Sequence, residues 1–351
     1  MEIIKEEIQK KIEDLRKEIG HEEAEVNIKE IIYIPAEEKL IIITPDRPDK
    51  SAVIGKGGWV VGRLKESLGV KNIHVAAYVD IMVKEYRMKL ALKKLNTFLS
   101  EDIIKDQQPL QNLKKLLLKK MENPHDFNFM DYFNLTDHPY NDSSDIKNDQ
   151  HTLVALSGGV DSSFSLIIAH LLGFNPLALT VDPGSIVLPK HFKNNIESLC
   201  HLLKVPQVYV PADFTGIIND SFQGRFHPCG PCSKKVHEKI FDYAHKNNFK
   251  IVIFGDLLST GCQSILSSEG IIRINLPALL GVSKQELKKV SYHFGVKKVA
   301  GFGCPLLGEV EKKFPHMSRY SIQRVLRETR SGALEPGEAL ELIWSSCKHF
   351  K

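Results

Sequence analysis

The residue types best suited to chemistry gather in residues 157–163, which read Ser-Gly-Gly-Val-Asp-Ser-Ser. An apolar run precedes them and an amphipathic run follows, which predicts a buried strand, a tight loop and a helix N-terminus. The glycines let the backbone approach a ligand, and the N–H groups of the loop and the helix start then face an anion. The hydroxyls of Ser157, Ser162 and Ser163 add donors for phosphate oxygens. A carboxylate at Asp161 indicates a bridging Mg²⁺, because it would repel phosphate directly. The alternative is a serine-capped turn between a strand and a helix.

These residues resemble the PP-loop motif SGGxDSS of the N-type ATP pyrophosphatase superfamily. The chain has no G-x-x-x-x-G-K-[ST] run of the Walker type. The resemblance implies that ATP is cleaved between its α and β phosphates and that AMP is placed on a substrate oxygen. It assigns ATP binding to Ser157, Gly158, Gly159, Val160, Asp161, Ser162 and Ser163. Members of the superfamily include tRNA thiolases, GMP synthetase, NAD synthetase and argininosuccinate synthetase.

The chain after residue 151 alternates apolar strands with helices, which predicts an α/β fold with a doubly wound parallel sheet. The PP-loop resemblance implies the same HUP-like sheet. Ligands bind at the carboxyl ends of such strands, so the loops 157–163, 181–185 and 255–261 are expected to converge. The resemblance extends ATP binding to Thr180, Val181 and Asp182 after the second strand, and to Gly255 and Asp256 after the fourth. Thiolases often carry Gly-His-x-x-Asp-Asp at the fourth strand, whereas this chain reads Gly-Asp-Leu-Leu-Ser-Thr.

A Cys-Gly-Pro-Cys run, Cys229 to Cys232, precedes a helix expected at residues 233–247. A thiol pair at a helix N-terminus is expected to have a lowered pKa. A thioredoxin-type dithiol, a structural zinc site and an iron–sulfur cluster are the alternatives. Zinc would require a closed set of four ligands, for which His227 or Cys262 are candidates.

One branch of PP-loop tRNA thiolases carries a Cys-x-x-Cys pair after the third strand and a distant Cys-Pro. Cys304-Pro305 matches the latter, so the resemblance implies a [4Fe-4S] cluster held by Cys229, Cys232 and Cys304. One iron would then stay open for hydrosulfide. Cys262 is the rival third ligand or a persulfide carrier, Cys200 is expected in the core, and Cys347 in the tail. Lys234 and Lys235 are candidate catalytic residues that would neutralise phosphate or the leaving pyrophosphate, with surface solvation as the alternative.

The N-terminal region has the order helix, strand, strand, short helix, Gly-Lys-Gly-Gly, helix, strand. This order resembles a small α+β KH domain of type II, in which a G-x-x-G loop clamps single-stranded nucleic acid. The resemblance makes Gly55, Lys56, Gly57 and Gly58 the RNA-binding residues. A glycine-rich turn or a protein-binding module is the alternative. The arginine-rich helix expected at residues 318–330 would contact RNA phosphate or the cluster loop.

Length and composition fit more than one domain. The 351 residues are 42% hydrophobic and 26% charged, and the net charge of +4 is too mild to establish a nucleic-acid partner. We expect a KH-like domain with a trailing helix at 1–98, a helix and linker at 99–150, a PP-loop domain at 151–310 and a helical tail at 311–351. No signal or membrane-spanning run is recognised, which predicts a cytoplasmic protein with reduced thiols.

Together these features predict an ATP-dependent sulfurtransferase that adenylates an RNA base, expected in tRNA, and replaces its oxygen by sulfur. Its cofactors would be ATP, Mg²⁺ and the iron–sulfur cluster, and its sulfur donor would be sulfide or a carrier protein. One alternative is another AMP-forming PP-loop reaction, such as amidation. A further alternative is an RNA-binding sensor of ATP and cluster. The sequence leaves the modified nucleoside open, and also the oligomeric state, for which a homodimer is one option.

Overall fold

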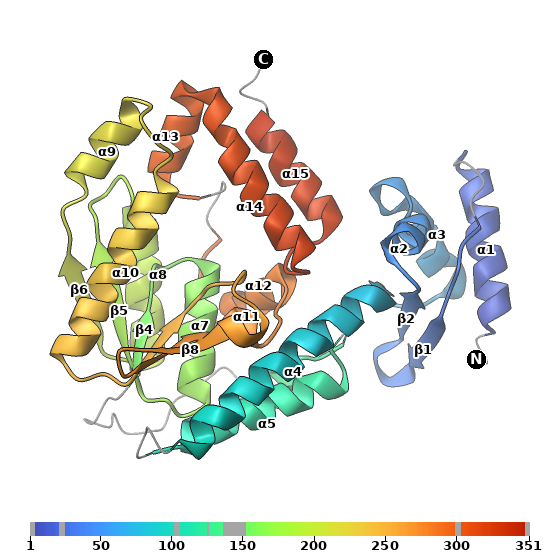
Figure 1. The fold of residues 1–351 in the computed structure, drawn as a ribbon. Coiled ribbons are helices and arrows are strands. Elements are labelled where there is room, and N and C mark those ends of the chain that lie inside the picture. Colours follow the sequence, from blue (N-terminus) through green and yellow to red (C-terminus); the bar gives the residue numbers. More distant parts are fainter. Residues whose placement is uncertain are drawn as a thin grey trace. The chain divides into compact units, whose positions relative to one another are not determined.

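The structure is a computed structural model that describes residues 4–20, 25–101, 106–124, 126–135, 152–298 and 303–347 (Figure 1). The chain divides into two compact units, one formed by Met1–Tyr86 with Asn123–Asp126 and the other by Arg87–Glu122 with Phe127–Lys351. The division falls within one long helix, α4 (Tyr78–Ser100). The end of the linker and His151 lie outside the described residues. Among the described residues, no helix combines the length and the apolar composition needed to cross a membrane.

The small unit has the element order that the sequence predicts. Its elements are α1 (Lys5–Glu18), β1 (Glu30–Ile34), β2 (Lys39–Thr44), α2 (Arg47–Ile54), α3 (Trp59–Leu68) and β3 (Asn72–Ala77). β2 is the central strand, antiparallel to β1 and parallel to β3. Ile12 of α1, Leu40 and Ile42 of β2, and Val60 and Leu64 of α3 share one buried cluster. This apolar cluster holds the three helices on the sheet.

The large unit is built on a six-stranded sheet in the order β6-β5-β4-β7-β9-β8. Its strands are β4 (Thr152–Ala155), β5 (Pro176–Asp182), β6 (Gln207–Pro211), β7 (Ile251–Phe254), β8 (Ile265–Ser268) and β9 (Ile271–Asn275). All neighbouring pairs are parallel except β8 with β9. The predicted doubly wound parallel sheet is therefore confirmed, and an antiparallel edge strand is added to it. The strand order reverses between β4 and β7, which makes this point the switch point where such sheets bind ligands.

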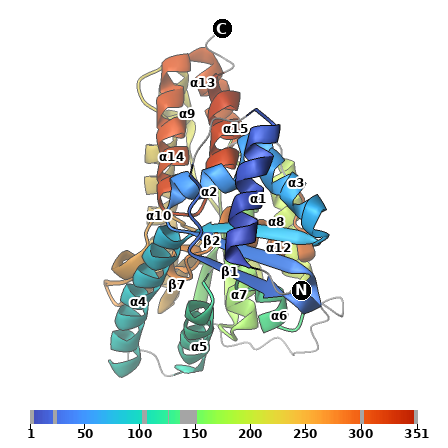
Figure 2. The same cartoon turned by 90° about the vertical axis from the view of Figure 1, so that its right-hand side faces the viewer.

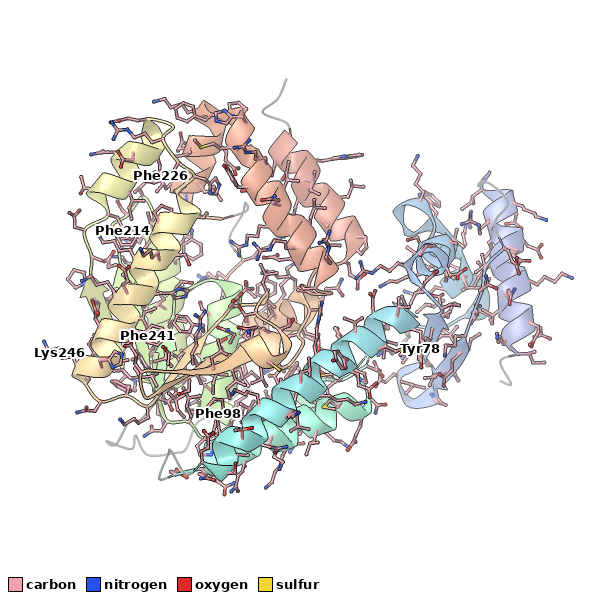
Figure 3. The ribbon with its side chains drawn as sticks, in the orientation of Figure 1. Tyr78, Phe98, Phe214, Phe226, Phe241 and Lys246 are labelled. Carbon is pink, nitrogen blue, oxygen red and sulfur yellow. The ribbon has the colours of Figure 1, made fainter. Side chains whose placement is uncertain are left out.

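Helices cover both faces of this sheet. They are α7 (Val160–Leu171), α8 (Lys190–Leu202), α9 (Thr215–Phe222), α10 (Cys229–Lys246), α11 (Leu276–Leu279) and α12 (Lys284–His293). Neighbouring residues of β4 point to opposite faces, since Val154 packs with Ile168 of α7 and Leu153 packs with Ile240 of α10. Phe241 of α10, labelled in Figure 3, packs on Phe254 with ring centroids 6.1 Å apart.

The remaining helices of the large unit flank this core. They are α5 (Gln108–Glu122), α6 (Phe129–Tyr132), α13 (Pro305–Lys313), α14 (Ser318–Arg330) and α15 (Pro336–Cys347). The aromatic part of the predicted linker packs on this core, where Phe129 meets Phe164 of α7 edge to face with ring centroids 5.3 Å apart. α14 and α15 lie side by side in both views of the ribbon (Figures 1 and 2). Val325 of α14 and Ala339 of α15 are buried in the same apolar cluster.

Candidate active site

The loop between β4 and α7 has a shape that its glycines and serines dictate. Gly158 has φ +74°, and a Cβ there would lie 2.4 Å from the carbonyl oxygen of Phe192, so only glycine fits. The hydroxyl of Ser162 donates to the carbonyl of Gly159 at 3.1 Å and accepts from the backbone N–H of Ser157 at 3.1 Å. The loop therefore holds its shape through its own hydrogen bonds and opens at the N-terminus of α7, where an anion is favoured.

Two buried side chains complete this loop. The amide of Asn195 in α8 donates to the carbonyl of Gly158 at 3.1 Å and to that of Lys297 at 3.2 Å, which fixes the glycine peptide. The hydroxyl of Ser163 is buried and has no hydrogen-bond partner among the described residues. A buried hydroxyl without a partner is costly unless a ligand satisfies it, so its presence fits a phosphate-binding loop.

The loop after β7 approaches the first loop closely. A Cβ on Gly255 would lie 2.7 Å from the backbone nitrogen of Ser162, so the two backbones are in direct contact. The predicted convergence of the loops 157–163 and 255–261 is therefore confirmed at the switch point of the sheet. Asp256 works within its own loop, where its carboxylate accepts from the backbone of Leu258 at 2.9 Å and from the hydroxyl of Ser259 at 2.5 Å.

The end of β5 is hydrogen-bonded to the residue that precedes the loop 157–163. The hydroxyl of Thr180 donates to the carbonyl of Leu156 at 2.8 Å, and Val181 is buried beside it. Asp182 accepts from Lys193 at 2.5 Å and from the N–H of Gly184 at 3.1 Å. Burial alone would raise the pKa of Asp182, but these two donors together with the charge of Lys193 lower it.

Asp161 is the acidic residue of the loop and is paired with a lysine that the sequence did not single out. Lys284, the first residue of α12, places its Nζ 2.6 Å from Asp161 Oδ2 and 4.0 Å from Glu328 Oε2. Glu328 of α14 in turn accepts from Arg324 Nε at 3.0 Å. The loop, α12 and α14 thus meet in four alternating charges, Asp161, Lys284, Glu328 and Arg324, which we call the charge quartet.

Arg324 connects this quartet to the cysteines. Burial by itself would lower the pKa of Arg324. The negative charges of Glu328, Asp161 and Cys229 outweigh burial, so the pKa of Arg324 lies above its usual value. An effect of this kind requires that the guanidinium group lie near both the phosphate loop and the thiol of Cys229. One side chain therefore faces the predicted nucleotide site and the predicted sulfur site together.

The three predicted cluster ligands gather around Cys304. Burial, with a smaller contribution from Cys304, raises the pKa of Cys229 to about 12. Burial also raises the pKa of Cys232 to about 11, again with Cys304 contributing. The fold thus returns Cys304, the N-cap of α13, to the first turn of α10. Among the described residues, no three Cys, His, Asp or Glu side chains are arranged to hold a metal ion.

The expected lowering of the thiol pKa at the helix start is wrong. α10 begins at Cys229 and not at residue 233, so both cysteines lie within its first turn. Burial and the neighbouring thiol outweigh the favourable helix dipole and Arg324. These raised values contrast with a thioredoxin-type dithiol, in which the pKa of the attacking thiol is lowered.

The surroundings of the thiols are partly polar. His227 Nε2 lies 3.6 Å from Glu311 Oε1, and the hydroxyl of Ser321 donates to the same oxygen at 2.5 Å. Glu311 of α13 is nearly buried, and the ring of His227 packs on Tyr320 with centroids 5.0 Å apart. His227, the predicted alternative zinc ligand, is thus close to a carboxylate near Cys229, but its buried Nε2 has no hydrogen-bond partner among the described residues.

Other predicted site residues lie apart from this centre. Lys234 pairs with Glu238 along α10 at 3.9 Å and its side chain is 81% exposed, while Lys235 donates to the carbonyl of Asp213. Cys262 is exposed, and its Sγ lies 4.0 Å from the carbonyl oxygen of Leu90. Cys200 is buried in α8 as expected, where burial raises its pKa to about 12. The side chain of Cys347 lies outside the described residues, and Gly55, Lys56, Gly57 and Gly58 belong to the small unit.

Lys284, Glu328 and Asn195 are site residues that the sequence analysis missed. A signal for Lys284 existed, because Ser283 and Glu286 form a capping box that starts α12 at this lysine. The sequence gives no comparable signal for Glu328 or Asn195, since each looks like an ordinary polar residue of a helix.

A doubly wound α/β sheet with an SGGVDSS loop at its switch point has the architecture of a PP-loop protein. No protein-family model matches the chain. The uncharacterized protein MJ1638 of Methanocaldococcus jannaschii is 30% identical over 265 residues, which cover 76% of this chain and 94% of that protein. The chain therefore belongs to the same family as MJ1638.

Two similar solved structures have low overall agreement with this one. The U34-tRNA thiolase NcsA from Methanococcus maripaludis, solved with its [4Fe-4S] cluster, is 14% identical with a TM-score of 0.34, covering 58% of this chain and 72% of that one. The NH3-dependent NAD synthetase from Campylobacter jejuni is 15% identical with a TM-score of 0.31, covering 58% and 89% of the two chains.

Proposed function

We propose that this protein is an ATP-dependent, AMP-forming sulfurtransferase that acts on RNA, with tRNA as the expected substrate. The observation that carries the proposal is the position of Arg324, which bonds Glu328 beside the Lys284–Asp161 pair of the phosphate loop and whose pKa is raised by Cys229 as well as by Asp161. A sulfurtransferase of this class requires an activating phosphate site and a soft sulfur site next to each other. This juxtaposition also favours the proposal over amidation, which needs no thiol beside the nucleotide.

The proposed role of the phosphate loop is to bind and orient ATP. The N–H groups at the start of α7 and the hydroxyl of Ser163 would donate to phosphate oxygens, and Asp161 would hold Mg²⁺. A base carbonyl oxygen then attacks the α-phosphorus, and the bond from that phosphorus to the pyrophosphate oxygen breaks. The products of this step are pyrophosphate and a base whose oxygen carries AMP. Hydrosulfide next attacks the base carbon, and AMP leaves with the original oxygen.

The proposed role of Cys229, Cys232 and Cys304 is to hold an iron–sulfur cluster. Three soft thiols suit iron–sulfur or zinc by their chemistry. A cluster held by these three cysteines would supply a soft iron site for hydrosulfide. The thiols themselves must lose their protons on assembly, and their half-buried position beside Arg324 keeps the resulting negative charge compensated.

The proposed RNA contact is the Gly-Lys-Gly-Gly loop of the small unit. Gly55, Gly57 and Gly58 have φ values of +72°, +64° and +78°, and a Cβ on Gly55 would lie 2.2 Å from Val60 Cγ2. Lys56 is exposed within this loop. A loop that only glycine can form, carrying one free-standing lysine charge, is suited to follow a single-stranded phosphate backbone. Sulfide or a carrier protein would be the sulfur donor.

The test combines three measurements on protein purified without oxygen. We expect iron and acid-labile sulfide, release of AMP and pyrophosphate from ATP in the presence of tRNA, and a thiolated nucleoside by mass spectrometry. Cys304→Ala should lose the iron, the sulfide and the thiolated product while still binding a non-hydrolysable ATP analogue. Cys262→Ala is the matched control, because this thiol is exposed and lies near Leu90.

The outcomes separate the parts of the proposal. Release of ADP and phosphate by the wild type would contradict the PP-loop chemistry. Stoichiometric zinc without sulfide would contradict the cluster. Iron lost in Cys262→Ala but kept in Cys304→Ala would assign the third ligand to Cys262. ATP and cluster binding without any turnover on RNA would favour a sensor.

A further inference from the structure

The charge quartet lies where a triphosphate would need positive charge. The loop 157–163 contains no lysine or arginine, and its one charged residue, Asp161, is negative. Backbone N–H groups and hydroxyls supply partial charges only, so they cannot balance a nucleotide triphosphate together with Asp161. Two side chains near this loop carry a full positive charge: Lys284 pairs with Asp161 at 2.6 Å, and Arg324 is held next to Lys284 by Glu328.

The geometry of the quartet keeps these two cations ready for an anion. Glu328 is 2% exposed, and its Oε1 accepts from Arg324 Nε at 3.0 Å. Its other carboxylate oxygen, Oε2, is buried without a hydrogen-bond partner among the described residues and lies 4.0 Å from Lys284 Nζ. The Arg324 side chain is still 49% exposed, so a ligand can reach it although Glu328 anchors it.

We propose that Lys284 and Arg324 bind the β- and γ-phosphates of ATP and hold the pyrophosphate as it leaves, with Glu328 as the residue that positions both cations. The inference deepens the proposed function and rests on it. When the bond between the α-phosphorus and the bridging oxygen breaks, its electron pair stays on pyrophosphate. The added negative charge develops beside two fixed cations, which stabilise it most strongly at that moment.

Lys284 and Arg324 have the chemistry to bind RNA phosphate as well as ATP phosphate. The ligands used in the test distinguish these two kinds of phosphate. Isothermal titration calorimetry would measure binding of inorganic pyrophosphate, of α,β-methylene-ATP with Mg²⁺, of AMP and of tRNA. Lys284→Met and Arg324→Gln should each weaken binding of pyrophosphate and of the ATP analogue about tenfold to a hundredfold, the usual loss for a hydrogen bond to a charged group. AMP affinity should change by less than about twofold, because AMP lacks these phosphates.

Matched controls lie on the same helices. Lys289→Met in α12 and Arg327→Gln in α14 remove exposed charges outside the quartet and should leave the affinities for pyrophosphate and for the ATP analogue unchanged. Arg324→Lys keeps a charge but loses the planar fork, so an intermediate pyrophosphate affinity is expected. Thermal unfolding of each variant would identify any loss of fold.

Three results would overturn the inference in different ways. In the first, the wild type binds pyrophosphate and folded Lys284→Met and Arg324→Gln bind it equally well. This result would reject the phosphate-binding role of the two cations and leave the proposed use of ATP standing. Weaker tRNA binding with unchanged pyrophosphate binding would assign the cations to RNA. A wild-type protein that binds neither pyrophosphate nor the ATP analogue would reject this inference together with the proposed use of ATP.

Discussion

At the scale of single residues, the absence of a Cβ at Gly255 allows the loops 157–163 and 255–261 to touch. We expect Gly255→Ala to weaken binding of an ATP analogue strongly, because the new Cβ would lie 2.7 Å from Ser162 N and 2.8 Å from the carbonyl carbon of Asp161. Both neighbours are backbone atoms of the phosphate loop, so the loop itself would have to move. Overpacking of this kind costs about 1–3 kcal/mol of stability. Calorimetric titration and urea unfolding would measure the two effects.

The matched substitution is Gly216→Ala in α9, where an added Cβ meets nothing within 4 Å. It should leave nucleotide binding unchanged and keep or slightly raise stability, since alanine favours a helix by up to about 1 kcal/mol. Equal effects of Gly216→Ala and Gly255→Ala would show that close contact of the two loops does not matter for binding.

The sequence predicts which residues come together where chemistry and spacing coincide, and their roles stay predictions. The loop 157–163 and the gathering of Cys229, Cys232 and Cys304 follow from types and spacing that few other structures require. Lys284 and Glu328 could not be found in this way, because they reach Asp161 only through the packing of α12 and α14. Long-range charge pairs of this sort leave no local pattern in a chain.

At the scale of elements, the buried Lys120 joins α5 to α12 and α6 within the large unit. Its side chain is fully buried, pairs with Glu286 of α12, and lies over the ring of Phe129 at 4.6 Å from the centroid. Lys120→Ala should destabilise the large unit by about 3 kcal/mol, because removing one partner leaves a carboxylate in a poorly solvated place. The midpoint of urea unfolding, followed by circular dichroism, would measure the change.

Lys119→Ala is the comparison for this effect, because Lys119 is 59% exposed and pairs only with Glu122 at the surface. A surface pair of this type contributes about 0–1 kcal/mol. The double variant Lys120→Met with Glu286→Gln should be more stable than Lys120→Ala, since it leaves no charge unpaired. Similar midpoints for Lys119→Ala and Lys120→Ala would contradict a structural role for the buried pair.

Element boundaries show which local signals are strong. The strands β4 to β7 and the helix α14 agree with the sequence pattern, whereas the hairpin β8–β9 and the short helix α9 were not predicted. These are short elements, for which periodicity is a weak signal. The start of α10 was placed too late because Gly230 and Pro231 suggest a loop. Pro231 is tolerated there, since the first turn of a helix leaves its N–H groups without helical partners.

At the scale of the whole molecule, the chain carries its two proposed binding functions on separate compact units. The glycine loop of residues 55–58 belongs to the small unit, while the phosphate loop and the thiols belong to the large one. The sequence predicts the order of elements in both units, but RNA binding by the small unit remains a proposal. A substitution in one unit should therefore change one binding function and leave the other intact.

The sharpest test of this separation is charge reversal in the glycine loop. The double variant Lys56→Asp with Gly57→Asp should bind tRNA more weakly, because two carboxylates would repel phosphate where one lysine attracted it. Its affinity should also depend less on salt, since the slope falls by about 0.7 for each lost contact with single-stranded phosphate. Titration of labelled tRNA at several salt concentrations would measure both. Binding of an ATP analogue should stay at the wild-type value.

The fluorescence of the neighbouring Trp59 is an independent probe of RNA binding at the glycine loop of residues 55–58. Trp59 is 63% exposed at the start of α3, and Trp344 is the other tryptophan of the chain. In a Trp344→Phe background, bound RNA should therefore change the fluorescence of Trp59, and the double variant should lose that change. Lys65→Asp, an exposed position of the same helix, controls for a general loss of positive charge. Unchanged tRNA affinity of the double variant at low salt would show that RNA binds elsewhere on the chain.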